Sequence, residues 1–221
     1  MGYTEHLKIL AKGVGAWNEW RMKIPDSAPD VSRMNYDDRD FRGINFSGAN
    51  ISNAKLRRVN FEGANLSRAF LFGSDLRGSN FTNANFEGTD LSQVKLDQAI
   101  LTNTNSAGAV LNEANFNGRD LRGINCSGAN LFGASFIAAD LRGANLSGAY
   151  LGTARLHAAN LEGADLRNAN LAEADMSETK LREAHLEGAN FMGVSLAKAD
   201  MTLSQRMFFK FKAQTKMPKD I

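Results

Sequence analysis

The sequence predicts an all-β solenoid, in which short extended segments wind repeatedly around one apolar axis. Three observations lead to this prediction. Every fifth position from Phe41 to Met201 holds Leu, Phe, Met or Ile, except at Ser106 and Cys126. Alanine stands two residues before 21 of these central positions, and glycine stands two residues after 16 of them. Neither the 3.6-residue period of a helix nor the two-residue alternation of a plain strand repeats every five residues.

Each five-residue unit has the form Ala-Asn/Asp-Leu-x-Gly, which indicates a short extended piece followed by a corner. In an extended segment, residues two positions apart point to the same side. We therefore expect the small residue and the central residue to face the axis. The recurring glycine supplies the corner because it tolerates the backbone angles of a sharp turn. The remaining residues are expected to face outward.

A longer internal similarity indicates how many units make one coil. Residues 35–51 and 115–131 are identical at 11 of 17 positions. The offset between the two segments is a whole number of four-unit coils but not of three-unit coils. This offset favours four units per coil over three.

Runs such as ADLRGANLSGAYLGTARLHAANLEGADLRNANL at 139–171 resemble the pentapeptide repeat proteins, and the resemblance covers 31–203 without a break in register. It implies a right-handed quadrilateral parallel β-helix, four-sided and with four units per coil. With that geometry, 31–203 would form about 8.5 coils. The resemblance implies little about function, because the repeat builds the body of every member whatever that body does.

Residues 1–30 form the predicted N-terminal cap, and solenoids need such a cover at each end. Apolar residues within this segment recur at steps of three and four residues: Leu7, Leu10, Val14 and Trp17. They predict one short amphipathic helix in the segment 6–21, weakened by Gly13 and Gly15. Trp17-Asn18-x-Trp20-Arg21 also resembles the N-terminal segment of many bacterial members of the family. A helix that docks a partner is the alternative interpretation.

Residues 204–221 are predicted to form a basic C-terminal helix or tail, with five Lys/Arg and one Asp. Its apolar stripe begins at Leu203 and continues through the residues of a possible C-terminal contact: Met207, Phe208 and Phe211. A cap on the last coil is the first interpretation. A homodimer contact is the second, because some family members pair through their C-terminal ends. A short basic helix on a membrane surface is the third.

Two central positions carry undersized residues, Ser106 and Cys126. With four units per coil they fall on one wall, and Phe116 and Phe136 fall on the opposite wall of the same coils. A large side chain opposite a small one preserves close packing in the core. An unfilled void of side-chain size would lower the stability by about 2–5 kcal/mol. We therefore interpret Cys126 as a packing residue. A reactive thiolate would need exposure and a basic neighbour.

Arg39 and Arg119 occupy the inward slot that alanine usually fills. A guanidinium cannot be buried there without a partner. We expect both side chains to swing outward and to pair with carboxylates such as Asp120 or Asp140. Either a duplication within the chain or an exposed binding arginine would explain the pair.

The composition argues against several classes of function. Lys and Arg number 26 against 24 Asp and Glu, so no strong overall field attracts nucleic acid or an anionic membrane. One cysteine excludes an internal disulfide, and no apolar run suggests a signal peptide or membrane span, so a cytoplasmic location is expected. No phosphate-binding loop or metal-spaced His/Cys cluster is present. A catalytic Ser106 would need a histidine, and His157 and His185 are expected to face outward several coils away. We expect no enzyme, cofactor or metal.

One wall of the predicted β-helix has apolar residues at outward positions across several coils. The residues of this aromatic wall are Phe70, Phe72, Val110, Phe132, Tyr150 and Met192. Several aligned surface aromatics can form a patch that binds a protein. Incidental exposure, with neighbouring long side chains covering the rings, is the alternative.

Two classes of function remain. The first is a non-enzymatic scaffold that binds another protein, or itself, through a flat wall. The second is implied by the quinolone-resistance and gyrase-protecting members, which resemble B-DNA and occupy the DNA site of a type II topoisomerase such as DNA gyrase. Residues 36–203 hold 19 Asp/Glu against 16 Lys/Arg, and no loop interrupts the repeats, which favours the scaffold. The acids that would make a local acidic patch are Glu162, Asp165, Glu173, Asp175, Glu178, Glu183 and Glu187.

Overall fold

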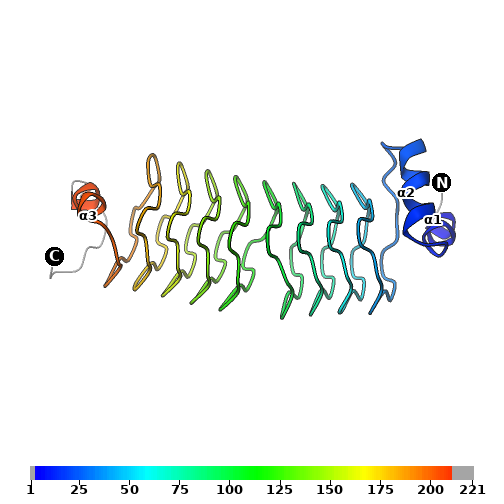
Figure 1. The fold of residues 1–221 in the computed structure, drawn as a ribbon, viewed down its shortest axis with the longest axis horizontal. Coiled ribbons are helices and arrows are strands. Elements are labelled where there is room, and N and C mark those ends of the chain that lie inside the picture. Colours follow the sequence, from blue (N-terminus) through cyan, green and yellow to red (C-terminus); the bar gives the residue numbers. More distant parts are fainter. Residues whose placement is uncertain (1–2, 211–221) are drawn as a thin grey trace. The chain divides into compact units, whose positions relative to one another are not determined.

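The computed structural model describes residues 3–210 and comprises two compact units, Met1–Val110 (unit 1) and Leu111–Ile221 (unit 2). Each unit contains a stack of parallel coils (Figure 1). Unit 1 also contains helices α1 (Tyr3–Leu10) and α2 (Val14–Lys23), and unit 2 contains helix α3 (Leu203–Lys210).

Parallel bridges in both units join equivalent residues of successive coils. Asn50 bridges Phe70 in unit 1, and Tyr150 bridges Asn170 in unit 2. The backbone N–H of Phe61 donates to the Asn80 carbonyl at 2.7 Å, and the Asn80 N–H donates back to the Val59 carbonyl at 2.9 Å. The bridge spacing therefore sets each coil at four five-residue units, as the internal similarity predicts.

The short extended pieces that the sequence predicts are limited to single bridge residues. Within residues 3–210 they form isolated bridges and no longer strands. The cause is the turn that occupies two residues of every five, because it leaves only one residue per unit to bridge the next coil. The sheet on each side is therefore built from single bridges stacked coil upon coil.

The turns place every fifth residue from Arg33 to Lys198 in the left-handed backbone region, with φ between 55° and 73°. In many units the N–H that follows the turn donates to the central carbonyl, as from Ala49 to Phe46 at 3.0 Å. A positive φ at the third residue and this bond are the features of a type II turn. Glycine fits such a position without strain, yet 18 of these residues are not glycine.

The central residues form the apolar column that the sequence predicts. Every one from Phe41 to Met201 is at most 7% exposed. Aromatic rings stack between coils: Phe61 and Phe81 lie 5.1 Å apart in unit 1, with 7° between their planes. Burial of each such side chain contributes about 1.5–3 kcal/mol, which makes the column the main source of stability.

At three places where serine or threonine replaces alanine in the small inward slot, the hydroxyl group bonds to the previous coil, whereas Thr104 and Thr179 bond to a carbonyl three residues before them. The Ser74 hydroxyl donates to the Ile51 carbonyl at 2.9 Å, and the Thr89 hydroxyl donates to the Leu66 carbonyl at 2.7 Å. These bonds satisfy polar groups that burial would otherwise leave unpaired.

The N-terminal segment contains two helices, so the prediction of one amphipathic helix through 6–21 is wrong. Gly13 has a φ of 102°, which no helix accommodates, and it separates α1 from α2. Gly15 is compatible with α2 and lies inside it. Leu10 and Trp17 are buried, as expected for the apolar stripe.

Helix α3 begins with a capping box in which Thr202 and Gln205 bond to each other's backbone N–H. The Gln205 amide also donates to the Leu181 carbonyl at 2.7 Å. Leu203 and Met207 are 77% and 52% exposed, so this part of the predicted stripe does not pack on the coil. The side chain of Phe208 and all of Phe211 lie outside the described residues. Between residues 3 and 210, no helix has the length and apolarity to cross a membrane.

Candidate protein-contact surface

In unit 1 the aromatic wall is a pair of rings. Phe70 is 54% exposed and Phe72 is 40% exposed, whereas Val110 is half-buried. The bridges place Phe70 in one column with Asn50, Asp90 and Val110. Two polar residues thus flank Phe70, and Val110 stands two coils away from it.

In unit 2 the aromatic wall is a second pair. Phe132 and Tyr150 are 52% and 59% exposed. Phe132 follows Asn130, the bridge partner of Tyr150, by two residues, so the two rings belong to adjacent coils. A Cβ atom on Gly152 would lie 3.1 Å from the Phe132 ring, so the ring covers this glycine and turns its other face outward.

Met192 is also exposed, at 52%, but it stands apart from the unit 2 pair. Ala172 occupies the equivalent position on the coil between Gly152 and Met192. Within each unit, the predicted wall therefore consists of one aromatic pair and one separate aliphatic side chain. Sequence reasoning missed Ile100, which is 49% exposed and lies on another side of its coil.

The predicted acidic residues of unit 2 do not gather on one side. On a four-unit coil they fall into four groups around the axis: Glu162 with Glu183, Asp165 with Glu187, Glu173 alone, and Asp175 with Glu178. Two of the seven also have basic partners, at 2.6 Å from Arg167 to Asp165 and 3.5 Å from Lys198 to Glu178. The acids are thus spread around the coils and partly neutralised.

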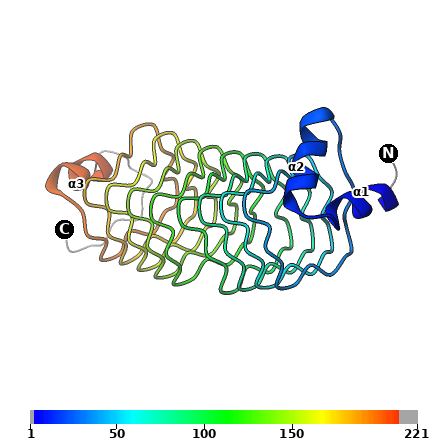
Figure 2. The same ribbon diagram turned by 45° about the vertical axis from the view of Figure 1, so that its right-hand side comes forward.

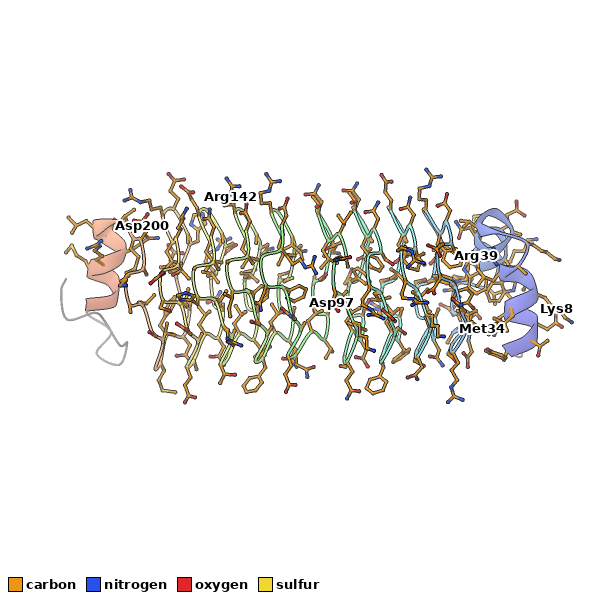
Figure 3. The ribbon with its side chains drawn as sticks, turned by 90° about the horizontal axis from the view of Figure 1, so that it is seen from below. Lys8, Met34, Arg39, Asp97, Arg142 and Asp200 are labelled. Carbon is orange, nitrogen blue, oxygen red and sulfur yellow. The ribbon has the colours of Figure 1, made fainter. Side chains whose placement is uncertain are left out.

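An aspartate at the bridge position often pairs with an arginine two residues later. Arg122 lies 2.7 Å from Asp120, and Arg142, which projects outward in Figure 3, lies 2.6 Å from Asp140. The guanidinium group lowers the pKa of each aspartate below its ordinary value. The expectation that Arg119 would pair with these carboxylates is wrong, because the nearer arginines already hold them.

Arg39 and Arg119 do turn away from the core. Arg39 is exposed and Arg119 is half-buried. Among residues 3–210, neither forms an ion pair within 4.0 Å.

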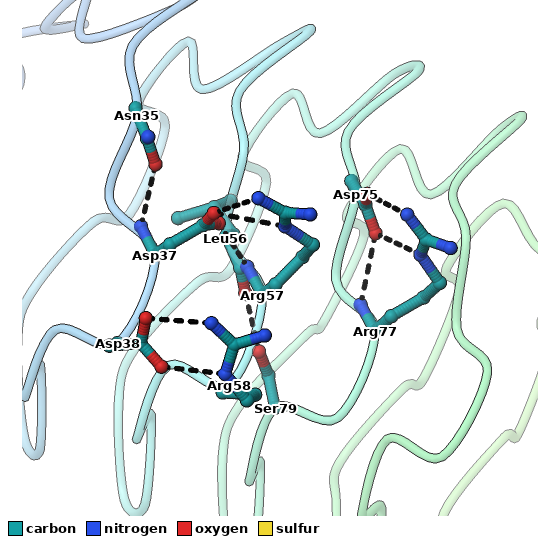
Figure 4. A network of polar contacts seen from close by, with 9 residues as sticks. All are labelled: Asn35, Asp37, Asp38, Leu56, Arg57, Arg58, Asp75, Arg77 and Ser79. Atoms are coloured by element: carbon teal, nitrogen blue, oxygen red, sulfur yellow. Dashed lines mark hydrogen bonds and ion pairs between the residues drawn. The ribbon is translucent and has the colours of Figure 1, made fainter.

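A second charged network crosses between coils of unit 1 (Figure 4). Arg57 binds Asp37 and Arg58 binds Asp38, each pair joining equivalent residues of adjacent coils. These arginines and Arg77 line a pocket of about 380 Å³. Each guanidinium group already holds a carboxylate, so the pocket offers little uncompensated charge to an external anion.

Neither Cys126 nor the contact between His157 and Ser177 has the arrangement of an activated nucleophile. Cys126 is buried, and burial raises the pKa of its thiol to about 12. His157 Nδ1 lies 2.9 Å from Ser177 Oγ, a contact that sequence reasoning missed. The Ser177 hydroxyl, however, donates to Asp175 at 2.6 Å, so its proton is not directed to the histidine as nucleophile activation requires. The described residues contain no group of three or more His, Cys, Asp or Glu that could hold a metal ion.

The sequence matches the family described as Pentapeptide repeats in eight copies, over residues 40–78, 89–125, 109–148, 149–188 and 169–204. These matches cover well over half of the chain. The chain belongs to the pentapeptide repeat family. The fold of that family is the right-handed β-helix, so the predicted fold class is confirmed at this level.

Solved pentapeptide repeat structures are similar to this protein. HetL, involved in heterocyst differentiation regulation in the cyanobacterium Nostoc sp. strain PCC 7120, has 26% identity over 82% of this chain and 92% of its own, with a TM-score of 0.45. AT2G44920 from the Arabidopsis thaliana thylakoid lumen has 37% identity over 50% of this chain and 73% of its own, with a TM-score of 0.45. The plasmid-mediated fluoroquinolone resistance protein QnrB1 has 20% identity over 86% of this chain and 98% of its own, with a TM-score of 0.31. No protein with a curated description matches the sequence.

Proposed function

We propose that this pentapeptide repeat protein is a non-enzymatic scaffold that binds another protein through one side of its β-helix. The observation behind this proposal is the exposure of two aromatic pairs, Phe70 with Phe72 in unit 1 and Phe132 with Tyr150 in unit 2. Aromatic residues are enriched in protein interfaces because they bury a large area with little loss of conformational freedom. Here each pair is attached to a backbone that bridges hold on both sides.

Paired substitutions test the scaffold. We expect Phe70→Ser with Phe72→Ser, and separately Phe132→Ser with Tyr150→Ser, to abolish or strongly weaken capture of specific partners from a lysate of the native host. Ile100→Ser is the matched control, because Ile100 has similar exposure on another side. The same partners retained by both double variants, in similar amounts, would count against the proposal.

Topoisomerase mimicry is the alternative that the family suggests, and two observations weigh against it. The acids of unit 2 lie on all sides of its coils, and several aspartates of the bridge columns, such as Asp120 and Asp140, pair with arginines. A DNA mimic needs a surface of uniform negative potential. In a gyrase supercoiling assay we expect neither inhibition by the protein nor relief of quinolone inhibition, and either effect would favour mimicry over the scaffold.

The finer parts of the architecture belong to the same proposal. We take 31–203 as a β-helix of about 8.5 coils, closed by the N-terminal helices and by α3 as caps. The hypothesis also includes a homodimer that forms through the C-terminal end, where Met207 is exposed. It includes a cytoplasmic location as well. Sedimentation of the full chain, compared with a Met207→Glu variant, tests the dimer.

A further inference from the structure

The first coil of unit 1 has a free edge. In the later coils of unit 1 the N–H of each bridge residue donates to the coil before it, as from Lys55 to the Met34 carbonyl at 2.9 Å and from Asn60 to the Arg39 carbonyl at 2.9 Å. The equivalent residues of the first coil are Asp30, Asn35, Asp40 and Asn45. These four N–H groups have no preceding coil to bind.

Side chains of α1 and α2 take the place of that coil at two of the four residues. The Asp30 N–H donates to His6 Nδ1 at 3.1 Å, and the Asn45 N–H donates to Asn18 Oδ1 at 2.8 Å. Burial lowers the pKa of His6, which favours the neutral ring that can accept this bond. The Trp17 indole adds a bond to the Asn45 carbonyl at 2.7 Å.

The other two residues keep an open edge. The N–H groups of Asn35 and Asp40 have no hydrogen-bond partner among residues 3–210, and both residues are exposed. An unpaired edge of this kind is a template for another extended chain.

A groove of about 510 Å³ runs along this open edge, between the helices and the first coil. Its apolar lining includes Leu7, Leu10, Val14 and Phe41. Figure 2 shows α1 and α2 over this end of unit 1, and Figure 3 labels Met34 and Arg39 beside them. The volume and lining suit one or two apolar side chains of a ligand.

Arg39 lines the same groove and supplies its charge. It is exposed and without an ion pair among the described residues, whereas the neighbouring Asp40 carboxylate binds Arg42 at 2.6 Å. The groove therefore joins three features: free backbone donors, apolar walls and one uncompensated cation.

We propose that this groove binds an extended, acidic segment of a partner protein, which extends the β-helix by part of a coil. Carbonyl groups five residues apart in that segment accept the N–H groups of Asn35 and Asp40, as the Met34 and Arg39 carbonyls accept Lys55 and Asn60. One apolar side chain of the segment fills the groove, and a carboxylate binds Arg39. The site is separate from the aromatic wall, so its failure would leave the proposed scaffold untouched.

The probe is an acetylated peptide with the sequence of residues 171–180, LAEADMSETK, which has the five-residue spacing and three acids. We expect it to shift the amide resonances of Asn35 and Asp40 in the full-length protein and to slow their hydrogen exchange. Arg39→Gln should weaken binding about fivefold, the effect of losing one exposed charge pair. A peptide with its three acids replaced by amides should bind the native protein equally weakly.

Arg119→Gln is the matched control, because Arg119 holds the same repeat position without helices beside it, and it should bind the probe like the native protein. Asn35→Pro removes a free N–H without removing an internal bond from that group, so it should keep the fold and lose the probe. Unchanged exchange at Asn35 and Asp40, or equal binding by native protein and Arg39→Gln, would overturn the proposal. So would self-association of the protein through this groove, detected as a dimer that the native protein forms and the Asn35→Pro variant does not.

Discussion

Thr153 stands where the backbone favours glycine. Its φ is 55°, and its β-branched side chain is exposed, so packing gains little from it. The left-handed conformation costs an ordinary residue about 1–2 kcal/mol, and glycine loses part of this advantage through its greater freedom when unfolded. The repeat tolerates such residues because the buried column contributes far more than one strained turn removes.

We expect Thr153→Gly to raise the free energy of unfolding by about 1 kcal/mol, measured by urea denaturation. The reverse change at an equivalent turn, Gly148→Thr, should lower it by a similar amount, since the φ of Gly148 is 65°. A Thr153→Gly protein less stable than the native chain would show that φ does not limit this turn.

The Cys126 thiol should not react in the folded protein. Because burial raises its pKa to about 12, the thiolate is scarce at pH 8, and the core excludes the reagent. We expect a disulfide reagent such as DTNB to label it only after unfolding in guanidinium chloride. Rapid stoichiometric labelling of the native protein would contradict its packing role. The idea that Phe116 fills the space left by the small side chain of Ser106 concerns residues of two different units, so it stays a prediction.

At the scale of elements, α2 is held to the first coil by specific polar contacts more than by an apolar stripe. Arg21 is 2% exposed and donates to the Ser27 carbonyl and to both the carbonyl and the hydroxyl of Ser47. Trp17 is fully buried, with its ring 5.2 Å from that of Phe46. These side chains close the end of the stack where no coil precedes it.

Trp17→Ala should therefore destabilise the protein by about 3–5 kcal/mol, the usual result of emptying a large buried aromatic site. Hydrogen exchange at Asn45 should rise at the same time, because the helix that protects its N–H would loosen. Met22→Ala is the control: Met22 lies in the same helix and is 74% exposed, so its loss should change stability by less than about 0.5 kcal/mol. Equal effects of the two changes would mean that α2 is not a structural element of unit 1.

The whole molecule should lose stability in acid through its aspartate–arginine pairs. Arginine lowers the pKa values of Asp75, Asp140 and Asp165 in the folded protein, so these carboxylates stabilise it above their ordinary pKa. This stabilisation disappears as the pH falls through the lowered folded values. We expect the urea midpoint to be flat from about pH 7 to 5 and to fall below about pH 4. Asp140→Asn should reduce that fall, and an unchanged slope would assign the acid sensitivity to other carboxyl groups.

Most of the fold could be predicted from the sequence, because one rule repeats along the chain. A residue in the central slot has no alternative to burial, so the column follows from period and polarity alone. The helices were less predictable: the apolar steps of 6–21 continue through Gly13, and only the backbone angle of that residue shows the break. Neither do the spacings reveal hydroxyl bonds such as that of Ser74.

The sequence predicts which side of the coil each candidate residue faces, but it does not predict which side chains form ion pairs with one another. The period places Phe70 and Tyr150 outward, and the four-unit coil also places Asn50 and Asp90 on either side of Phe70, but neither gives the exposure of each ring. The predicted pairing of Arg119 with Asp120 or Asp140 is wrong, because Arg122 and Arg142, each two residues after one of these aspartates, already bind them. Competition between neighbouring charges depends on side-chain geometry, which a repeat pattern does not contain.

The four-unit coil also limits how the aromatic wall of unit 2 can change when residues are inserted or deleted. Loss of one five-residue unit between Tyr150 and Met192 would preserve the alternation of small and large core residues, but it would carry Met192 a quarter of the way around the axis. Loss of a whole coil would shorten unit 2 and return every later side chain to its original face. Insertion or deletion of whole units or whole coils can therefore lengthen, shorten or reorient a binding face while the pattern of core residues stays the same.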